Sequence, residues 1–224
     1  MNDTDERQGK RTRMRGEERR ALILARAKQV FATHSYAEAS TSLLAQESEV
    51  TEPMLYKHFG SKKGLFLAVV HEYSLLFFEL WHEQLVQREK EGLLHALLSI
   101  VLDYGKVMAS DPDIHRVLHQ ALAESNDPDF AACVSKHNQK VADSITDLLL
   151  HAQQAGLLEE GVDLRAATLG YLSMVYTMQY SYKLNIRHLL DYELLEKTSR
   201  IWLRGLLNEQ ARNRLAESGQ VSAP

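Results

Sequence analysis

The hydrophobic positions of this chain recur at the spacing of α-helices. Over residues 17–34, one helical face collects the apolar side chains Ile23, Ala27, Val30 and Phe31. No stretch sustains the alternation of apolar and polar residues that a half-buried β-strand requires. The four prolines and eleven glycines are also few for 224 residues. The pattern therefore predicts an all-α protein whose first helix ends near residue 34.

The segment after this first helix carries the start and stop signals of two short helices. Ser40 or Thr41 is suited to cap the first, whose apolar residues are Leu43, Leu44 and Ala45. Thr51 is suited to cap the second, and Pro53 falls in its first turn, where a missing N–H group costs little. Gly60 is expected to end it. Two short helices packed on a preceding one form a helix-turn-helix, in which the second short helix enters the major groove of DNA.

Longer helices are predicted beyond Ser61, which is suited to cap the first of them. Their expected bounds are residues 62–88, 91–110, 111–124, 129–155, 163–184 and 190–211. Cap-and-proline pairs favour two of the starts, at Asp111–Pro112 and Asp127–Pro128. The helix 129–155 carries an apolar stripe of Phe130, Val134, His137, Val141, Ile145, Leu148 and Ala152, which neighbours must cover.

These elements predict four segments. Residues 1–16 are polar and charged and are expected to be a flexible basic arm. Residues 17–63 form the three-helix DNA-binding domain. Residues 64–212 are expected to form a larger C-terminal helical bundle. Residues 213–224 are expected to be a frayed tail.

The net charge of −4 hides an uneven distribution along the chain. Residues 1–63 contain twelve Lys and Arg against nine Asp and Glu, whereas residues 64–224 contain fourteen against twenty-one. Between Arg7 and Lys28, nine basic residues face two acidic ones. A basic patch on an otherwise acidic protein can bind the phosphate backbone of DNA. For the arm from Arg7 to Arg20, contact with a minor groove and a solvated tail are both open.

Cysteine usage and the apolar stretches indicate the compartment. The single cysteine, Cys133, rules out an internal disulfide and suits a reducing cytoplasm. The first fifteen residues carry charges throughout and lack the apolar core of a secretory signal. The stretches near residues 65–80 and 166–182 are apolar but contain polar side chains, so we expect buried helices there and no membrane span. The protein is therefore expected in the cytoplasm.

One run of residues has a specific counterpart among known proteins. The run is Val50-Thr51-Glu52-Pro53-Met54-Leu55-Tyr56-Lys57-His58-Phe59-Gly60-Ser61-Lys62, and its supporting residues are Phe31, Tyr36, Leu44 and Ala45. It resembles the recognition segment of the tetracycline-repressor (TetR) family of bacterial transcription regulators. The resemblance covers residues 17–70. It implies a sequence-specific DNA-binding protein, by the family's usual mode a repressor that a small-molecule effector releases from its operator.

Each motif residue also has a physical role of its own. Leu55 and Phe59 are four residues apart, so both are expected to face the core. Tyr56, His58 and Lys62 are expected to contact phosphate, whereas Glu52, Pro53, Met54 and Lys57 are expected to read bases. The full predicted DNA-binding set is Thr41, Ser42, Thr51, Glu52, Pro53, Met54, Tyr56, Lys57, His58 and Lys62.

The sequence departs from the family pattern at the turn and at base-reading positions. Glu49 stands where the family usually has glycine, and a non-glycine residue in a left-handed conformation costs about 1 kcal/mol. We therefore expect either a slightly strained turn or a different turn geometry. Ser42 stands where the founding member has a base-reading arginine, so the operator sequence is not transferable from a relative.

Aromatic and methionine side chains in the second half predict an effector pocket. The predicted ligand-binding set is Phe77, Trp81, Tyr104, Met108, His115, His119, Met174 and Met178, for which core packing is the alternative. His115 and His119 are four residues apart, a spacing that can chelate a metal, but no third ligand is evident and no metal or cofactor is predicted. The effector is expected to release DNA by tilting the helix that begins at Lys62.

The expected partners follow from the two halves. The protein is expected to be a homodimer on double-stranded, palindromic operator DNA, with an effector of unknown identity. The helices 163–184 and 190–211 are expected to pair across the dimer as a four-helix bundle through residues such as Leu194, Ile201 and Trp202. The alternatives are an all-helical enzyme, for which the sequence shows no local catalytic motif, and a DNA-packaging protein, which the acidic, aromatic-rich second half disfavours.

Overall fold

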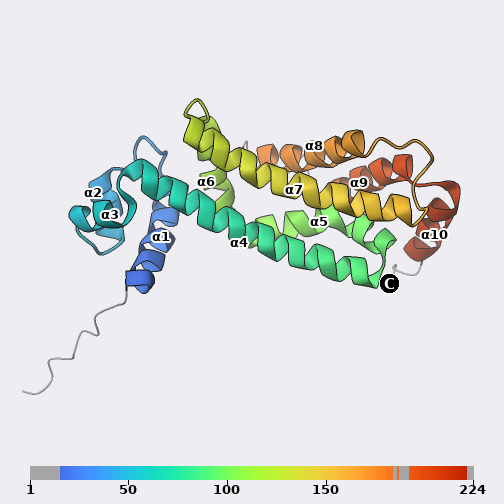
Figure 1. Ribbon diagram of the computed structural model, residues 1–224, viewed down its shortest axis with the longest axis horizontal. Helices are drawn as coiled ribbons and strands as arrows, with labels where there is room; N and C mark the ends of the chain where they lie inside the picture. The colour runs from blue at the N-terminus through green and yellow to red at the C-terminus, as the bar shows by residue number, and fades with distance from the viewer. Residues whose placement is uncertain (1–15, 184–185, 187–191, 221–224) are drawn as a thin grey trace, which may run out of the picture. The chain divides into compact units, whose positions relative to one another are not determined.

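The computed structural model describes residues 16–183, 186 and 192–220 (Figure 1). These residues form α-helices and one isolated β-bridge, which confirms the predicted all-α class. The helices are α1 (Gly16–Thr33), α2 (Thr41–Glu47), α3 (Glu52–Phe59), α4 (Lys62–Glu91), α5 (Leu93–Ser110), α6 (Pro112–Ala123), α7 (Pro128–Gln154), α8 (Leu164–Lys183), α9 (Tyr192–Leu206) and α10 (Glu209–Gln220). The described residues up to Val69 form one compact unit, and those from Val70 form a second.

The first unit contains α1, α2, α3 and the first residues of α4. Its core is built by the apolar face that the sequence predicts for α1, where Ile23, Ala27 and Phe31 are fully buried. The Phe31 ring meets that of Phe66 edge to face, with centroids 4.7 Å apart, and the Tyr36 ring lies 5.0 Å from Phe66. Burial of these rings fixes α1 against the start of α4.

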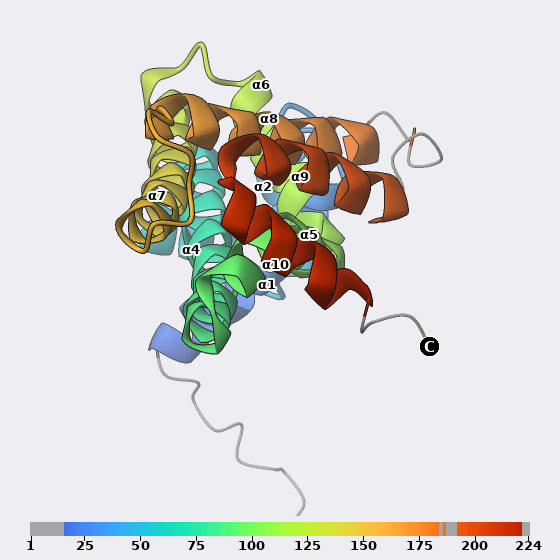
Figure 2. The ribbon, with the colours of Figure 1, turned by 90° about the vertical axis from the view of Figure 1, so that its right-hand side faces the viewer.

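The second unit is a helical bundle around α5. Helix α5 contacts α6, α7, α8 and α9, and its apolar residues are buried on most sides. The largest fully buried side chains of this unit are Trp81, Tyr104 and Tyr171. Helices α8 and α9 lie side by side (Figure 2). Gly170 permits this approach, because a Cβ atom there would lie 2.8 Å from Nε1 of Trp202.

The sequence predicts one last helix over residues 190–211, and this prediction is wrong in one respect. In the structure the helix ends at Leu206 and a second helix begins at Glu209. Leu207 forms the β-bridge with Leu158, which interrupts the helix. The side chain of Asn208 then caps α10 by accepting a hydrogen bond from the Ala211 N–H group, and its Nδ2 donates to the Gly156 carbonyl at 2.7 Å.

The predicted tail must also be corrected. Residues 213–220 continue α10, and Leu215 is buried in the core of the second unit. Burial of an apolar side chain offsets the entropy that would otherwise fray a chain end. The rest of the predicted tail, residues 221–224, and the predicted arm up to residue 15 lie outside the described residues.

Two helices are long and apolar enough to cross a membrane by length and composition alone, namely α4 and α5. Core helices of globular proteins pass the same test. Both supply side chains to the cores described above, among them Trp81 of α4 and Leu97 of α5. This agrees with the buried helix predicted for residues 65–80.

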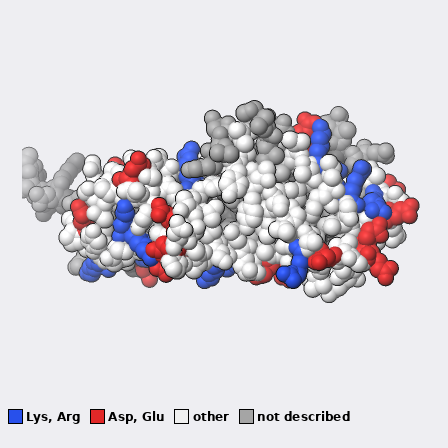
Figure 3. All heavy atoms as spheres, turned by 90° about the horizontal axis from the view of Figure 1, so that it is seen from above, with Lys and Arg blue, Asp and Glu red and all other residues white. Residues whose placement is uncertain are grey.

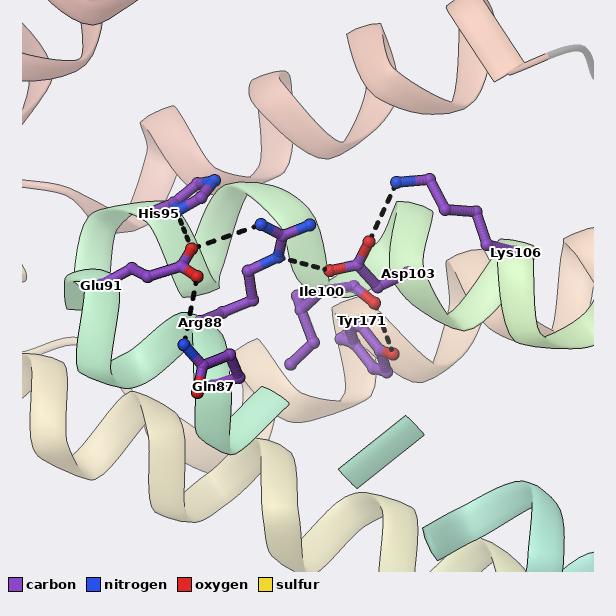
Figure 4. A network of polar contacts seen from close by, with 8 residues as sticks. All are labelled: Gln87, Arg88, Glu91, His95, Ile100, Asp103, Lys106 and Tyr171. Carbon is purple, nitrogen blue, oxygen red and sulfur yellow. Dashed lines mark hydrogen bonds and ion pairs between the residues drawn. The ribbon is translucent and has the colours of Figure 1, made fainter. Parts of the chain in front are cut away.

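A buried carboxylate ties the end of α4 to α5 (Figure 4). Arg88 Nε donates to Asp103 Oδ2 at 3.1 Å, and Lys106 Nζ donates to Oδ1 of the same carboxylate at 3.1 Å. The Asp103 side chain is only 5% exposed. The hydrogen bond to Asp103 is the main reason that the pKa of Arg88 is raised. Arg88 also contacts Glu91 at 3.3 Å, so one guanidinium serves both carboxylates.

Candidate DNA interface and internal cavity

Helix α3 packs on the first unit by one face and leaves the other open. Leu55 is buried and Phe59 half-buried, as their spacing of four predicts. Tyr56 is 46% exposed and Lys57 is exposed on the outer face. The Arg20 guanidinium lies over the Phe59 ring at 5.3 Å, which holds α1 against the end of α3. The outer face is thus available for another molecule.

The caps predicted around α2 and α3 are in place, except that Thr51 makes no capping hydrogen bond. Ser40, not Thr41, caps α2 and accepts from the Leu43 N–H group at 3.1 Å. Gly60 ends α3 at a φ of 74°, and the Ser61 hydroxyl accepts from the Gly64 N–H group at 2.9 Å at the start of α4. Thr51 has the extended conformation of an N-cap, but its hydroxyl makes no capping hydrogen bond.

Two predicted base-reading residues have partners within the protein. Thr41 Oγ1 donates to Glu52 Oε2 at 3.0 Å, which joins α2 to α3. Arg19 Nη1 donates to Met54 Sδ at 3.4 Å, which joins α1 to α3. Both Glu52 and Met54 are half-buried. These contacts fix the orientation of α3 on the unit.

The predicted DNA-binding residues therefore fall into two groups by exposure. Thr41, Glu52, Met54, His58 and Lys62 are half-buried. The exposed members are Ser42, Thr51, Pro53, Tyr56 and Lys57. Pro53 and Lys57 are one helical turn apart and lie side by side on α3.

Lys62, a predicted phosphate contact, also has partners within the protein. Lys62 Nζ donates to the Tyr36 carbonyl at 2.8 Å and lies 4.6 Å from the centre of the Tyr36 ring. A second carbonyl, that of Ala37, is 3.5 Å away. The ammonium is thus occupied by the loop between α1 and α2. The ammonium has three N–H donors, so a phosphate contact by Lys62 stays a prediction.

The turn between α2 and α3 contains the strained residue that the sequence suggests. Glu49 has a φ of 54°, the left-handed region that favours glycine. The Glu49 N–H group donates to the Gln46 carbonyl and that of Val50 to the Ala45 carbonyl, both at 3.0 Å. These two bonds define a Schellman motif, whose left-handed position is usually glycine. The turn keeps its geometry and Glu49 bears the strain.

Replacing Glu49 by glycine is expected to stabilise the protein by about 0.5–1 kcal/mol, because the Cβ clash disappears at a position that needs a positive φ. Urea unfolding at a fixed protein concentration measures the change. Glu49→Ala is the matched control, since it removes the carboxylate but keeps the Cβ atom, and it should give no such gain. Equal stabilisation by both variants would assign the effect to charge and contradict the strain.

The second unit contains an internal cavity of about 40 Å³, room for a few water molecules. Its walls come from α6, α7 and α8, through the side chains of His115, Leu118, His119, Leu122, Val134, His137, Asn138, Tyr176, Gln179 and Tyr180. A more open groove of about 420 Å³ shares four of these residues, Leu122, Val134, Asn138 and Tyr176. The groove therefore adjoins the cavity along α7 and α8.

Two buried histidines of the cavity wall, His115 and His137, are uncharged at neutral pH. Burial lowers the pKa of His115 to about 3 and that of His137 to about 4, and the neighbouring His119 and His137 add to the effect on His115. Both rings meet Phe77 edge to face, at 5.9 Å and 5.8 Å between centroids. Both histidines are therefore neutral at neutral pH.

A short polar chain joins two residues of the cavity wall, His119 and Gln179, to α5. His119 Nε2 contacts the Gln179 carbonyl at 3.2 Å. The Gln179 side chain in turn donates to the Tyr104 hydroxyl at 3.0 Å. Tyr104 is fully buried, and burial raises its pKa. These contacts hold α8 at a fixed position against α5 and α6.

The predicted ligand-binding residues are divided between cavity and core. Only His115 and His119 line the cavity. The other six are packed in the hydrophobic core, namely Phe77, Trp81, Tyr104, Met108, Met174 and Met178. These six follow the core-packing alternative in this structure, and their role in ligand binding stays a prediction. Within the described residues, no group of three His, Cys, Asp or Glu side chains is placed to hold a metal ion.

Several lining residues were not predicted as ligand-binding. His137 had a signal in the sequence, because a histidine on an apolar helical stripe is buried with its polar atoms. Tyr176 belongs to the aromatic side chains of the second half that the sequence offered to a pocket or to the core. Asn138 and Gln179 had no signal, since their position depends on how α6, α7 and α8 pack. The predicted helix periodicity does not determine that packing.

Comparisons with known proteins bear on both units. The family model described as "Bacterial regulatory proteins, tetR family" matches residues 23–69, which include α2, α3 and most of α1. The curated relatives include the transcriptional activator FasR of Mycolicibacterium smegmatis, 38% identical over 61 residues that cover 27% of this chain and 28% of FasR. They also include the transcriptional repressor Rv1474c of Mycobacterium tuberculosis, 26% identical over 64% of this chain and 71% of the relative. The matched part of the chain thus spans little more than a quarter of FasR.

Solved structures share the fold over most of the chain. A TetR-family regulator of Mesorhizobium loti superposes with a TM-score of 0.72 at 15% identity, over 85% of this chain and 96% of that one. The regulator FadR of Bacillus subtilis, in complex with stearoyl-CoA, superposes with a TM-score of 0.65 at 18% identity, over 82% and 95% of the two chains. These likenesses confirm an N-terminal helix-turn-helix followed by a helical domain. Residues 23–69 are thus similar to the tetR family of bacterial regulatory proteins, and most of the chain shares its fold with solved structures of regulators.

Proposed function

We propose that this protein is a sequence-specific DNA-binding transcription regulator that represses its target genes and leaves its operator when a small molecule binds. The observation that carries the proposal is the geometry of α3. It is anchored by Leu55 and turns Tyr56 and Lys57 outward, on a three-helix unit that matches the tetR family model. The curated relatives are named transcription regulators, and Rv1474c is named a repressor. We propose no catalytic activity and a cytoplasmic location.

Lys57 is proposed to read a base. Its side chain is exposed at the centre of α3, and a lysine there can donate to the O6 and N7 atoms of guanine. Lys57→Ala should therefore weaken binding to the preferred operator by about 1–3 kcal/mol and relax the choice at one base position per half-site. Random duplexes should bind nearly as before. Fluorescence anisotropy with one selected operator and one scrambled duplex, at several salt concentrations, measures both affinities.

The matched control for this test is Lys90→Ala, which removes an exposed lysine from α4 outside the first unit. It changes the net charge equally and should leave the ratio of the two affinities unaltered. If Lys57→Ala weakened both duplexes by the same factor, Lys57 would be a phosphate contact and the proposed orientation of α3 would be wrong.

Helices α8 and α9 are proposed to form a homodimer interface. Ile201 is 73% exposed and Leu169 is 62% exposed, more than the other large apolar side chains that the structure describes, and Leu194 and Tyr192 are also exposed on α9. Figure 3 shows a broad surface with few charged side chains on the second unit. Exposed apolar side chains on two adjacent helices are typical of a surface that a partner covers.

Ile201→Glu is expected to convert the dimer into a monomer at micromolar concentration, because it places a charge within the proposed apolar interface. Sedimentation equilibrium measures the change. Leu80→Glu is the matched control: it alters an exposed leucine of α4 in the same way, outside α8 and α9, and should leave the dimer intact. A monomeric wild-type protein would contradict the proposed assembly.

The effector is proposed to bind in the cavity between α6, α7 and α8. At about 40 Å³ the cavity is small, so a larger molecule has to displace lining side chains and extend into the adjoining groove. Helix α4 contains residues of both units, and we propose that it carries the response to α3. Binding must favour one of two states of the protein to have this effect.

A further inference from the structure

The Glu52 side chain lies where the buried and the exposed faces of α3 meet. Glu52 is the first residue of this helix, and the first turn of a recognition helix is the part that contacts base edges. Tyr56, four residues later on the same side of the helix, is 46% exposed, whereas Leu55 is buried. Glu52 itself is half-buried. Its carboxylate therefore borders the outer face of α3 and still contacts the rest of the unit.

Thr41 of α2 holds this carboxylate by one of its two oxygens. Thr41 Oγ1 donates to Glu52 Oε2 at 3.0 Å, and Thr41 is itself half-buried. Among the residues that the structure describes, no hydrogen bond reaches the other oxygen, Oε1. A carboxylate oxygen has two lone pairs, so Oε1 can accept from a molecule outside the unit.

The same contact limits what Thr41 can do on DNA. A threonine hydroxyl has a single O–H donor, and Thr41 uses it on Glu52. Phosphate oxygens receive hydrogen bonds from the protein, so a hydroxyl needs its donor to contact them. In this arrangement Thr41 therefore acts on DNA through Glu52 and not by donating to a phosphate.

A carboxylate in the major groove distinguishes the four bases by their donors. At neutral pH a glutamate side chain has only acceptor atoms. Guanine presents the acceptors N7 and O6, thymine presents O4, and adenine presents the acceptor N7 beside its amino group. Cytosine presents its N4 amino group with no acceptor beside it. A fixed carboxylate is therefore best matched by cytosine.

We infer that Glu52 reads a cytosine in each half of the operator and that Thr41 is a positioning residue, which orients the carboxylate toward the amino group of that base. This inference rests on the proposed function, since it names the base that α3 recognises through these residues. The hydrogen bond from Thr41 removes part of the rotamer freedom that Glu52 would otherwise lose on binding. It also holds the negative charge in place against the repulsion of the phosphates.

Selection of bound duplexes from random DNA, followed by one base replacement, tests the inference. Each selected half-site should contain a cytosine that Glu52→Gln no longer requires, because an amide can donate as well as accept. Uracil paired with adenine then replaces this cytosine in both half-sites, which puts a carbonyl in the place of the amino group. Fluorescence anisotropy of the full-length protein with the two duplexes measures the ratio of affinities. We expect a ratio of about tenfold per half-site for the wild type and at most about twofold for Glu52→Gln.

Three threonine variants separate positioning from a structural role. Thr41→Val keeps the shape but removes the hydroxyl, and should lower the ratio to about threefold per half-site, because the carboxylate loses its orientation. Thr41→Ser keeps the hydroxyl and should restore the ratio. Thr33→Val makes the same change on α1, where the hydroxyl donates to the Gln29 and Val30 carbonyls, and should leave the ratio unchanged. A merely structural contact between α2 and α3 would make Thr41→Val weaken binding to both duplexes by the same factor.

Three results would overturn the inference. They are a selected half-site in which Glu52→Gln releases no cytosine, equal wild-type affinities for the cytosine and uracil duplexes, and an unchanged ratio in Thr41→Val. In each case the protein has still selected an operator, so the proposed regulator would stand and only the assigned reading would be wrong. A selection that recovered no common sequence would contradict the proposed function and this inference with it.

Discussion

Replacing Arg88 by methionine is expected to lower the free energy of unfolding by about 3 kcal/mol. Breaking one side of a buried ion pair typically costs about 3–5 kcal/mol, because the other charge remains buried without compensation. Asp103 is the charge that would lose its Arg88 partner, and its side chain is only 5% exposed. Lys106 still contacts it at 3.1 Å, and Arg88 itself is 32% exposed, which places the loss at the lower end of the range. Urea unfolding at a fixed protein concentration measures it.

Two further variants show whether the loss comes from the stranded carboxylate. Arg88→Met combined with Asp103→Leu should lose less than Arg88→Met alone, because no buried charge remains. Arg116→Met removes an exposed partner of Asp113, a pair 2.9 Å apart, and should cost less than about 0.5 kcal/mol. If the double variant were less stable than Arg88→Met, packing of the two side chains would matter more than their charges.

Stability is expected to fall steeply as the pH drops from about 6.5 to 4. The pKa values of His115 and His137 in the folded protein are lowered by burial to about 3 and 4, whereas an unfolded histidine titrates near 6.5. Above pH 6.5 neither state binds a proton at these rings, so their contribution is complete. Below it the unfolded chain takes up protons that the folded protein does not. Each histidine therefore removes up to about 1.4 kcal/mol per pH unit within this window.

The comparison of wild type with His137→Gln isolates this contribution from that of the carboxylates. Urea unfolding at several pH values between 4 and 7 should give a smaller slope for His137→Gln, by up to about 1.4 kcal/mol per pH unit. His151→Gln, an exposed change on the same helix, is the control. Equal slopes for wild type and His137→Gln would contradict a neutral, buried His137.

The sequence predicted the first unit closely because local signals determine it. The helix periodicity, together with Pro53 and Gly60, predicts three helices whose bounds agree with those of α1, α2 and α3 to within two residues. These helices are therefore confirmed. The strain at Glu49 was also visible, since a Schellman motif requires a left-handed residue wherever the helix before it stops. Here the turn geometry follows from neighbours a few residues apart.

The second unit was predicted less well because its details depend on contacts between distant segments. The break between α9 and α10 arises from Leu158 and Gly156, which lie some fifty residues before Leu207 and Asn208. Periodicity alone continues the helix through this point. Phe77 and Tyr104 fit a pocket as well as a core, and only the packing of α4 and α5 assigns them to the core.

The role of Lys62 shows the same limit at the DNA interface. A lysine at the start of a helix beside a recognition segment is a reasonable phosphate contact by position. The contact with the Tyr36 carbonyl depends on the path of the loop after α1, which carries no periodic signal. Lys57 and Lys62 both belong to the motif, but in the folded unit Lys57 is exposed and Lys62 is half-buried. Their position in the motif does not predict this difference.

Selection of bound duplexes from random DNA by the full-length protein tests the central claim most directly. Two copies of α3 in a symmetric dimer require two half-sites about one helical turn apart, roughly 34–36 Å. The account predicts that the selected sequences share an inverted repeat with this spacing, and that Lys57→Ala relaxes one position in each half. Recovery of no common sequence, or of a single half-site without a repeat, would contradict it.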